Sequence, residues 1–354
     1  MAGTSEVSAV RADERLDAET LAAYLRPRLE HAEGPLEIRQ FPGGHSNLTY
    51  LLRFGPTEYV LRRPPLGPVA PKAHDMTREH RVLAALWPVF APAPRPFLLC
   101  EDPSVIGAPF YVMERRRGLV VRRDLPADLA ALPDAPAKLA FALVDTLADF
   151  HAVDFRAVGL DGLGKPDGFV ERQVRGWAER WQRAKTREMP AIEELERWLL
   201  ARIPSSPAPT LLHNDWKLDN VMFAAGDPTR IVAVFDWEMA TIGDPLMDVG
   251  TLLGYWVQDD DPPVLTASLA SPTNLPGFPR RRELIERYAR RTGRDLAAIE
   301  FYQTFAYYKT AVVVEQIYVR YVRGQTRDER FAALEPGVPM LVEAAWDLAR
   351  RSGL

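Results

Sequence analysis

The sequence predicts an α+β protein with two lobes, a small lobe built on an antiparallel β-sheet and a larger lobe that is mostly helical. The chain has 354 residues, which is enough to bury a core in each of two lobes. Short runs of strand-like composition gather in residues 1–114, whereas segments with helical periodicity dominate residues 115–354. We therefore divide the chain into an N-terminal lobe, 1–114, and a C-terminal lobe, 115–354.

The N-terminal lobe is predicted to contain both helices and strands. Helical spacing of apolar residues predicts helices over 17–31, with Asp17 as the N-cap, and over 75–86. Short apolar runs predict two strands within 36–54, on either side of a glycine-containing loop, and further strands at 58–63, 97–100 and 109–113. Residues 88–96 are rich in proline and therefore form a connector.

The C-terminal lobe is predicted to be mainly helical because apolar residues recur along it at helical spacing. The predicted helices cover 135–151, 169–185, 192–203, 249–256, 280–291, 295–321 and 337–351. Trp177, Trp181 and Trp198 lie on two of them, where a core position is the more common role for tryptophan. The segment 262–279 has no such pattern and is long for a connection, which is typical of a lid or of a partly disordered loop.

The stretch 211–248 holds the most informative pattern of polar residues. Apolar runs at 211–212 and 221–223 flank a polar loop, and a third run, 231–235, ends on Asp236. The flanked loop holds the polar residues His213, Asp215, Lys217, Asp219 and Asn220. A turn-rich segment with Gly-Asp-Pro separates the last two runs and predicts a small hairpin. We expect Asp215, Asn220 and Asp236 to converge.

These residue types suit phosphoryl transfer. That reaction needs a hard cation on the phosphates, and Asn220 and Asp236 offer the oxygen ligands that Mg²⁺ prefers. It also needs a carboxylate that orients the attacking hydroxyl and accepts its proton, the role we predict for Asp215. Lys217 is placed to meet the phosphoryl group as it transfers, and His213 is expected to brace the loop. The alternative is an ordinary hairpin with a buried histidine, solvated acids and a loop lysine in water.

The spacing of these motifs resembles the aminoglycoside phosphotransferase family, whose relatives include choline kinase and other small-molecule kinases. His213-Asn214-Asp215 with Asn220 resembles that family's catalytic loop, and Phe235-Asp236-Trp237-Glu238 resembles its metal-binding strand end. Gly243-Asp244-Pro245 with Asp248 resembles the segment that follows, where both acids are expected to stabilise loop backbone. The runs FPGGHSNLTYLL and VLRRPP look closest to kinase-like domains joined to acyl-CoA dehydrogenases. The resemblance implies a bilobal protein-kinase-like fold.

The same resemblance implies ATP and Mg²⁺ as cofactors and gives candidate nucleotide-binding residues in the N-terminal lobe. The loop with Gly43, Gly44, Ser46 and Asn47 would cover the phosphates, although a plain hairpin turn is the alternative. Arg62 stands where kinase folds carry a phosphate-binding Lys, and Glu79 would be its partner. Arg63 should point to the opposite face of the strand, because strand side chains alternate. The alternative is that Arg62, Arg63 and Glu79 are surface charges.

The resemblance also implies a hinge between the lobes around Glu114 and Arg116, where main-chain groups would contact adenine. Composition sets the broader expectations. The net charge of -4 does not favour nucleic acid as a partner, and the single cysteine, Cys100, fits a reducing cytoplasm. No apolar leader and no run of membrane length is present. We therefore expect a cytoplasmic protein, monomeric or homodimeric, with a small-molecule hydroxyl acceptor as its partner and neither nucleic acid nor membrane.

The resulting hypothesis is an ATP-dependent phosphotransferase acting on an alcohol group of a small molecule. An acidic run, Asp259–Asp261, would suit polycationic antibiotics, whereas Arg115–Arg117, Arg320 and Arg323 would suit an anionic acceptor, and the acyl-CoA dehydrogenase resemblance implies hydroxyacyl compounds. A protein kinase is disfavoured because the proposed metal ligand Asp236 does not begin an Asp-Phe-Gly motif. The alternatives are a nucleotide-binding pseudokinase without turnover and, less favoured, a metal-dependent hydrolase.

Overall fold

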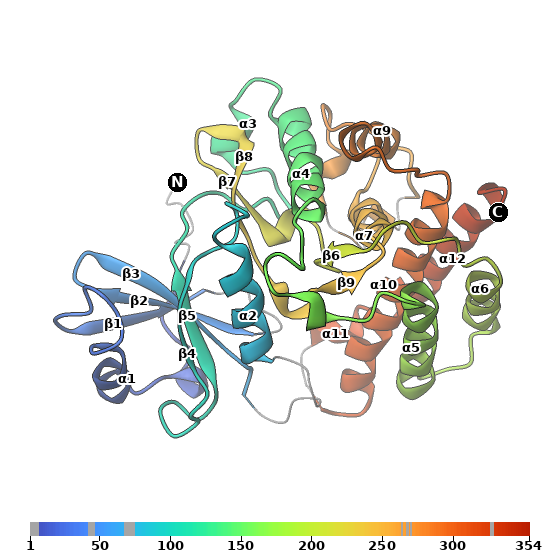
Figure 1. Cartoon of the computed structure of the whole chain (residues 1–354). Coiled ribbons are helices and arrows are strands. Elements are labelled where there is room, and N and C mark those ends of the chain that lie inside the picture. Colours follow the sequence, from blue (N-terminus) through green and yellow to red (C-terminus); the bar gives the residue numbers. More distant parts are fainter. Residues whose placement is uncertain are drawn as a thin grey trace. The chain divides into compact units, whose positions relative to one another are not determined.

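The computed structural model describes residues 7–41, 47–66, 75–262, 265–266, 269, 271–325 and 329–354 (Figure 1). It confirms an α+β protein with a five-stranded antiparallel sheet and a mostly helical part. The chain forms two compact units. The first unit comprises Met1–Arg117 and Val232–Ala240, and the second unit comprises Gly118–Ile231 and Thr241–Leu354. The segment Val232–Ala240, which the sequence-based division put in the C-terminal lobe, thus packs with the first unit.

The first unit is built on an antiparallel sheet with the strand order β1-β2-β3-β5-β4. The strands are β1 (Leu36–Gln40), β2 (Leu48–Phe54), β3 (Thr57–Arg63), β4 (Pro96–Cys100) and β5 (Phe110–Glu114). Its helices are η1 (Ala12–Glu14), α1 (Ala18–Leu25), α2 (Met76–Leu86) and η4 (Trp237–Met239). Gly55 closes the tight β2–β3 turn at a φ of 54°, which glycine adopts most easily. The Asp17 carboxylate caps α1 as predicted, although the helix ends at Leu25 rather than at residue 31.

The two faces of β3 are covered by different helices, so alternate side chains of this strand have different surroundings. Tyr59 and Leu61 belong to a buried core that also contains Leu21 and Leu25 of α1. Arg62 points the other way, toward α2. The period of two in the strand therefore decides which of its two terminal arginines approaches α2.

The second unit is mostly helical, and α10 runs through its centre (Figure 1). The longer helices are α4 (Ala135–His151), α5 (Phe169–Ala184), α6 (Pro190–Ala201), α7 (Leu246–Tyr255), α9 (Arg281–Thr292), α10 (Ile299–Val322) and α12 (Gly337–Arg351). Short helices are α3 (Ala127–Ala130), α11 (Glu329–Ala332), η2 (Asp161–Leu163), η3 (Leu218–Asn220) and η5 (Pro272–Asn274). All seven helices predicted for this part of the chain are present. Gly250 lets α7 approach α10 closely, since a Cβ there would lie 2.6 Å from the backbone of Tyr302.

Two small β-pairs frame the polar loop of residues 213–220. The predicted hairpin is confirmed as β7 (Val221–Ala224) paired with β8 (Asp227–Val234). The strand that precedes the loop, β6 (Thr210–Leu212), instead pairs antiparallel with β9 (Thr241–Gly243), a strand that the sequence pattern did not predict. Pairing of β6 with β9 brings the start of the loop next to the segment that follows Asp236 in the sequence.

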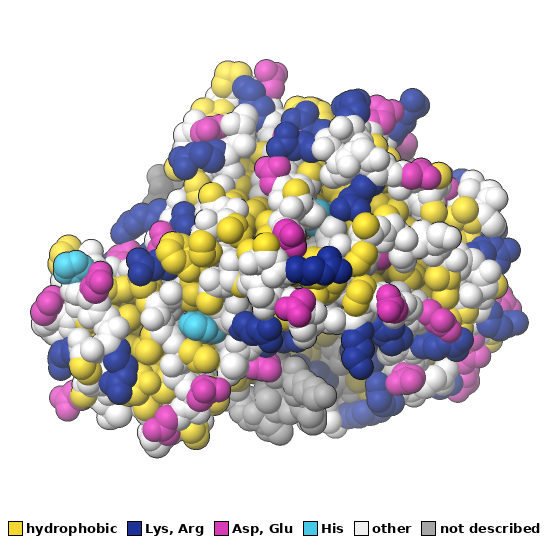
Figure 2. Space-filling view, in the orientation of Figure 1, with side chains coloured by type: hydrophobic (Ala, Val, Ile, Leu, Met, Phe, Trp, Pro, Cys, Tyr) yellow, Lys and Arg dark blue, Asp and Glu magenta, His cyan; other side chains and the backbone are white. Residues whose placement is uncertain are grey.

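The surface of the described residues carries both signs of charge. On the face shown in Figure 2, lysine and arginine side chains are interspersed with aspartate and glutamate side chains. None of the helices in the described part of the chain combines the length and the apolar character needed to cross a membrane.

Candidate active site

The first unit contains a buried arginine site, which we define as Arg62, Glu79, Tyr111 and Asp236. The Arg62 Nη2 atom lies 3.0 Å from the Asp236 Oδ1 atom and 3.2 Å from the Glu79 Oε1 atom. Glu79 lies in the first turn of α2, which the Asp75 side chain caps. The predicted Arg62–Glu79 pair is therefore present. The alternative that these are surface charges is wrong, because Arg62 is 8% and Glu79 1% exposed.

Burial and charge act against each other within the arginine site. Burial lowers the pKa of Arg62, but Glu79, Tyr111 and Asp236 together raise it above its ordinary value, so the guanidinium stays charged. Burial raises the pKa of Glu79, and the neighbouring Arg62 opposes that rise. The four residues line a small cavity of about 10 Å³, which is about the space of one water molecule. The site thus presents a fixed positive charge that two carboxylates orient.

Arg63 has a separate environment on the opposite face of β3. Its Nη1 atom donates to the Ile106 carbonyl oxygen at 2.8 Å, and its Nε atom lies 3.4 Å from the Pro64 carbonyl oxygen. Ile106 packs against the core that α1 covers. The structure therefore separates the two arginines, as strand alternation predicted.

Asp236 follows β8 with a left-handed backbone, at a φ of 64°. Such a conformation is uncommon outside glycine and clusters at functional sites. Arg62 contacts one carboxylate oxygen, and the side chain is 26% exposed, so the remaining oxygen is chemically suited to a hard cation. The neighbouring Glu238 accepts a hydrogen bond of 3.0 Å from the Asn47 amide, within the same unit.

Of the predicted phosphate-covering loop, Gly43, Gly44 and Ser46 lie outside the described residues, and Asn47 is buried beside Leu48 at the start of β2. At the predicted hinge, the Glu114 N–H donates to the Arg95 carbonyl oxygen at 2.8 Å within the sheet. The Glu114 side chain forms an ion pair of 2.9 Å with Arg116. Contact of the main chain there with adenine stays a prediction.

In the second unit, the polar loop brings Asp215, Lys217 and Asn220 together. The Lys217 Nζ atom lies 2.9 Å from the Asp215 Oδ2 atom. The Asn220 Nδ2 atom donates to the same oxygen and to the Asp215 carbonyl oxygen, both at 2.8 Å. Because the amide nitrogen of Asn220 is used in this way, its amide oxygen is the atom left for a cation. Joint ligation of Mg²⁺ by Asn220 and Asp236 stays a prediction.

The electrostatics of this loop keep Asp215 ionised. Burial raises the pKa of the Asp215 carboxyl, but Lys217 and Lys309 outweigh burial and hold that pKa below its ordinary value. Burial lowers the pKa of Lys217, whereas Tyr255 and Asp215 raise it, with a net rise. The Lys217 ammonium also lies 4.7 Å from the centroid of the Tyr255 ring. Lys217 is therefore held in place and is not a loop lysine in water.

A buried carboxylate, that of Asp248, holds the backbone of the loop. It accepts hydrogen bonds from the His213 N–H at 2.7 Å and the Asn214 N–H at 2.6 Å. His151 of α4 contacts Asp248 at 3.2 Å and the Tyr288 hydroxyl at 2.7 Å. Burial lowers the pKa of His151 more than the Asp248 carboxylate raises it. His151 is therefore a packed, hydrogen-bonded residue.

Further contacts support the roles predicted for His213 and Asp244. The His213 ring is fully buried, and its Nδ1 atom accepts from the Asp215 N–H at 3.3 Å. Asp244 accepts from the Leu246 N–H at 2.9 Å and from the Tyr302 hydroxyl at 2.6 Å. Both residues thus fix backbone or packing around the loop, as the pattern predicted.

Lys309 was not among the predicted site residues. Its Nζ atom donates to the Asn214 carbonyl oxygen at 2.7 Å, and Asn214 itself has a left-handed backbone with a φ of 64°. One feature of the sequence could have drawn attention to Lys309. It is a lysine within the mostly apolar central segment of α10, and lysine is seldom found in such surroundings. Position in the sequence could not connect it with Asn214, which lies 95 residues away.

A pocket of about 70 Å³ opens beside Lys217 in the second unit. Its described walls include Leu252, Tyr255 and Trp256 of the α7 region and the hydroxyl-bearing residue Thr273. Thr273 is fixed, because its hydroxyl accepts from the Val257 N–H and donates to the Val257 carbonyl oxygen. The pocket therefore has apolar walls from the α7 region and a polar side that carries a cation, Lys217, and a carboxylate, Asp219.

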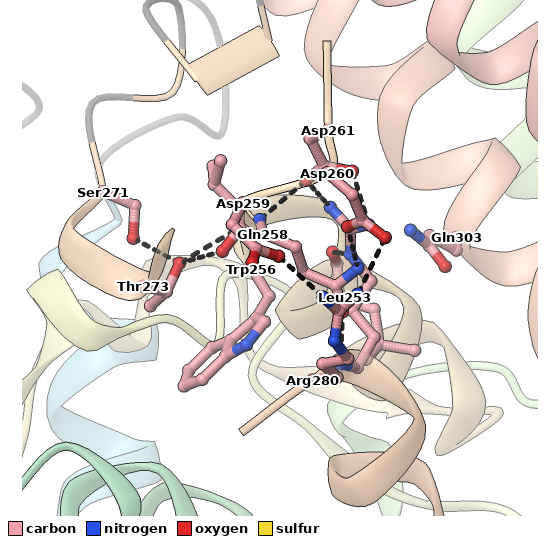
Figure 3. A network of polar contacts seen from close by, with 12 residues as sticks. Leu253, Trp256, Gln258, Asp259, Asp260, Asp261, Ser271, Thr273, Arg280 and Gln303 are labelled. Carbon is pink, nitrogen blue, oxygen red and sulfur yellow. Dashed lines mark hydrogen bonds and ion pairs between the residues drawn. The ribbon is translucent and has the colours of Figure 1, made fainter. Parts of the chain in front are cut away.

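The acidic run Asp259–Asp261 does not form a free acidic pocket, which corrects the expectation of a polycation site there. Figure 3 shows these side chains in a polar network with the start of α9. Arg280 pairs with Asp259 at 2.9 Å and with Asp260 at 2.7 Å. Arg281 pairs with Asp261 at 2.5 Å and donates to the Leu253 carbonyl oxygen. Each acid of the run is thus paired with an arginine, and Arg281 ties the end of α7 to α9.

The segment 262–279, predicted as a lid or a partly disordered loop, is described except for residues 263–264, 267–268 and 270. Its later part is tied to the end of α7. The Trp256 Nε1 atom donates to the Pro279 carbonyl oxygen at 2.9 Å, in addition to the contacts of Thr273 with Val257. A lid role for this segment stays a prediction.

The comparisons of sequence and structure with known proteins agree with one another. Residues 37–284 match the model of the phosphotransferase enzyme family. Over 360 residues the chain is 34% identical to human acyl-CoA dehydrogenase family member 11, covering 99% of this chain and 45% of that protein. The chain thus spans about half the length of the curated relatives it matches.

Solved structures show the same fold. A candidate aminoglycoside phosphotransferase from Ralstonia eutropha is 31% identical, with a TM-score of 0.78 that covers 95% of this chain and 99% of the other. A thermostable mutant of an aminoglycoside phosphotransferase, in ternary complex with AMP-PNP and hygromycin B, is 18% identical, with a TM-score of 0.59 over 95% and 99% of the two chains. The second likeness supports the fold alone.

Proposed function

Because the chain belongs to the phosphotransferase enzyme family, we propose that it transfers the γ-phosphate of ATP to a hydroxyl group of a small molecule. The observation that carries this proposal is the arrangement of Asp215, Lys217 and Asn220 in the loop of the second unit. An ionised carboxylate and a fixed cation stand side by side there, as the acceptor and the transferring phosphoryl group require. ATP as the donor is part of this proposal, and the structural neighbour described above was solved with AMP-PNP, an analogue of ATP.

Asp215 has the properties of the group that orients the acceptor. Its carboxylate is ionised and keeps its direction, because Asn220 and Lys217 both hold its Oδ2 atom. A weakly basic carboxylate is sufficient, since the attacking hydroxyl loses its proton late in a loose phosphoryl-transfer transition state. Lys217 then stabilises the negative charge on the transferring group, a stabilisation that costs no reorganisation because the ammonium is already in place.

The donor types suit Mg²⁺, since a carboxylate oxygen of Asp236 and an amide oxygen of Asn220 are each hard ligands of the kind this ion takes. When bound, the ion would neutralise charge on the ATP phosphates. The contribution of this chain is Arg62, a guanidinium that Glu79 and Asp236 orient and that can fork onto a phosphate. Asp236→Ala should therefore reduce the Mg²⁺ dependence of nucleotide affinity, with a smaller effect for Asn220→Ala. Equal Mg²⁺ dependence in Asp236→Ala and in the unchanged protein would contradict the assignment.

For the acceptor, we favour hydroxyacyl-type compounds over aminoglycosides. The pocket beside Lys217 combines apolar walls with one cation, Lys217, and one carboxylate, Asp219. Each acid of Asp259–Asp261 is paired with an arginine, so neither place offers a cluster of free carboxylates for a polycation. The acyl-CoA dehydrogenase names of the relatives point to acyl compounds in the same way.

A direct test measures ATP consumption with a panel of hydroxyacyl compounds, simple alcohols and aminoglycosides. Phosphorylation of a hydroxyacyl compound that is lost in Asp215→Asn would support the proposal. The matched control is Asp227→Asn, which removes an exposed carboxylate whose contacts, Thr229 and Arg230, lie within the β7–β8 hairpin. Nucleotide binding with no transfer to any hydroxyl would support the pseudokinase alternative instead.

A further inference from the structure

Two cations lie against one buried indole beside the loop that carries Asp215. The guanidinium carbon of Arg180, on α5, lies 4.4 Å from the centroid of the Trp177 ring. The ammonium of Lys309, on α10, lies 5.7 Å from the same centroid. The indole is 6% exposed, so it forms a rigid apolar floor between the two helices.

Neither cation forms an ion pair with a described residue, although Glu179 attracts Arg180, and Asp215 and Asp248 attract Lys309, from farther away. Arg175, on the same helix as Arg180, has a carboxylate partner, because it pairs with Glu171 at 2.8 Å. Arg180 contacts the indole and forms no ion pair with a described residue, and Lys309 makes its hydrogen bond with the uncharged Asn214 carbonyl oxygen. Arg180 disfavours the charged form of Lys309, and a ligand anion beside both cations would offset that repulsion.

The surroundings of Arg180 and Lys309 disfavour the charged form of both side chains. Burial, together with the nearby Arg183, lowers the pKa of Arg180. Burial also lowers the pKa of Lys309, against the attraction of Asp215 and Asp248, which lie farther away than an ion-pair distance. Asp215 and Asp248 are themselves engaged, the former by Lys217 and the latter by backbone N–H groups of the loop.

We propose that Arg180 and Lys309, on the indole of Trp177, form a subsite for an anionic group of the acceptor, a carboxylate or a phosphate. The inference rests on the proposed function, because it places the anion next to the hydroxyl that Asp215 orients. Lys309 links the two positions, since it holds the carbonyl of Asn214, the residue before Asp215. Arg180 is exposed and free to turn toward a ligand, and its planar fork suits either anion.

The subsite would fix the orientation in which the acceptor binds. An acceptor would carry its hydroxyl at Asp215 and its negative charge over α5 and α10. Aminoglycosides, which are polycations, would be repelled there. Specificity of this kind arises as much from rejection of the wrong charge as from attraction of the right one.

The test compares molecules that differ only in charge. The probes are ω-hydroxyhexanoate against its amide for the carboxylate, and hexanediol monophosphate against hexanediol for the phosphate. Dissociation constants are measured by ligand-observed NMR at low salt, without nucleotide, for the unchanged protein, Arg180→Gln and Arg175→Gln. Arg175→Gln is the matched control, because it removes an arginine of α5 that pairs with Glu171 instead.

We expect at least one anion to bind about tenfold more tightly than its neutral twin in the unchanged protein and in Arg175→Gln, with the ratio falling toward one in Arg180→Gln. Added salt should reduce the ratio. The arm that shows the preference distinguishes carboxylate from phosphate. Equal affinities within both pairs, no measurable binding of either anion, or an unchanged preference in Arg180→Gln would each overturn the subsite.

The measurement is independent of phosphoryl transfer. An anion preference that depends on Arg180, in a protein that phosphorylates no hydroxyl compound, would leave the subsite standing and the proposed function wrong. Transfer to neutral and anionic acceptors with equal kcat/KM, unaffected by Arg180→Gln, would leave the function standing and the subsite wrong.

Discussion

The arginine site of the first unit and the polar loop of the second unit hold their charges in different ways. In the arginine site, the side chains hold one another, because Arg62 is buried between two carboxylates. In the loop, the reactive side chains of Asp215 and Lys217 are partly exposed, and buried groups hold the backbone beneath them. A site that binds the same group in every turnover can have rigid, buried side chains. A site that an acceptor must enter needs accessible side chains on a rigid backbone.

This difference predicts that, in the loop, substitution of an exposed side chain lowers kcat, whereas substitution of a buried supporting group lowers the free energy of unfolding. In the arginine site, one substitution should change nucleotide binding and phosphate positioning together. The largest expected loss is about 4 kcal/mol of transition-state stabilisation. The smallest is a change in the unfolding free energy of at most about 1.4 kcal/mol per pH unit.

The largest effect is expected for Asp215→Asn. The amide keeps the shape but loses the charge and the capacity to accept the proton, so kcat should fall about 10³-fold, or about 4 kcal/mol. Steady-state kinetics with any accepted hydroxyl compound provide the measurement, and nucleotide affinity should stay nearly unchanged. Turnover within a few-fold of the unchanged protein would show that Asp215 is not the acceptor-orienting group.

The second effect concerns the base of the loop. Asp248→Ala leaves the N–H groups of His213 and Asn214 buried without a partner, so the free energy of unfolding should fall by about 3 kcal/mol. Urea titration measures it. Asp295→Ala is the control, because its carboxylate accepts one exposed backbone N–H and should matter by about 1 kcal/mol or less. Equal losses in the two variants would mean that Asp248 does not brace the loop.

In the arginine site, Arg62→Ala should raise the ATP KM and lower kcat together, with a loss in kcat/KM of about 30-fold, or about 2 kcal/mol. Arg63→Ala should leave both parameters close to those of the unchanged protein, because Arg63 contacts Ile106 on the opposite face of β3. Arg62→Lys should be intermediate, since an ammonium keeps the charge without the fork. Damage from Arg63→Ala with a silent Arg62→Ala would show that the functional arginine was misassigned.

The smallest effect is a pH dependence of stability from His151. Its pKa is lowered by burial, so the unfolded chain binds a proton that the folded chain resists as pH falls below about 6.5. The stability it contributes is complete above that pH and declines below it, by at most about 1.4 kcal/mol per pH unit. Asp248 and Asp244 favour the proton, and Arg294 opposes it.

The measurement for His151 is the unfolding free energy between pH 7.5 and pH 5.5, taken by urea titration at about one-unit steps. His151→Gln, which keeps a hydrogen-bonding side chain without a titrating ring, should flatten the decline. An identical slope in both proteins would assign the acid sensitivity to other groups.

The sequence alone determined the local features of this protein. The apolar periods predicted the helices of the second unit, and the turn chemistry around Gly226 predicted the β7–β8 hairpin. The spacing from His213 to Asp236 predicted a phosphotransferase site, and strand alternation separated Arg62 from Arg63. These features depend on neighbouring residues, whose relation the backbone geometry of a strand, turn or helix fixes in advance.

The tertiary structure alone decided which distant charges meet. His151 contacts Asp248 across 97 residues, and Lys309 reaches Asn214 across 95. The same holds for Asp259–Asp261, whose charges look free in the sequence but are paired with Arg280 and Arg281 at the start of α9. Whether a charge is buried, paired or available to a ligand depends on packing between elements, and local sequence patterns carry no information about that packing.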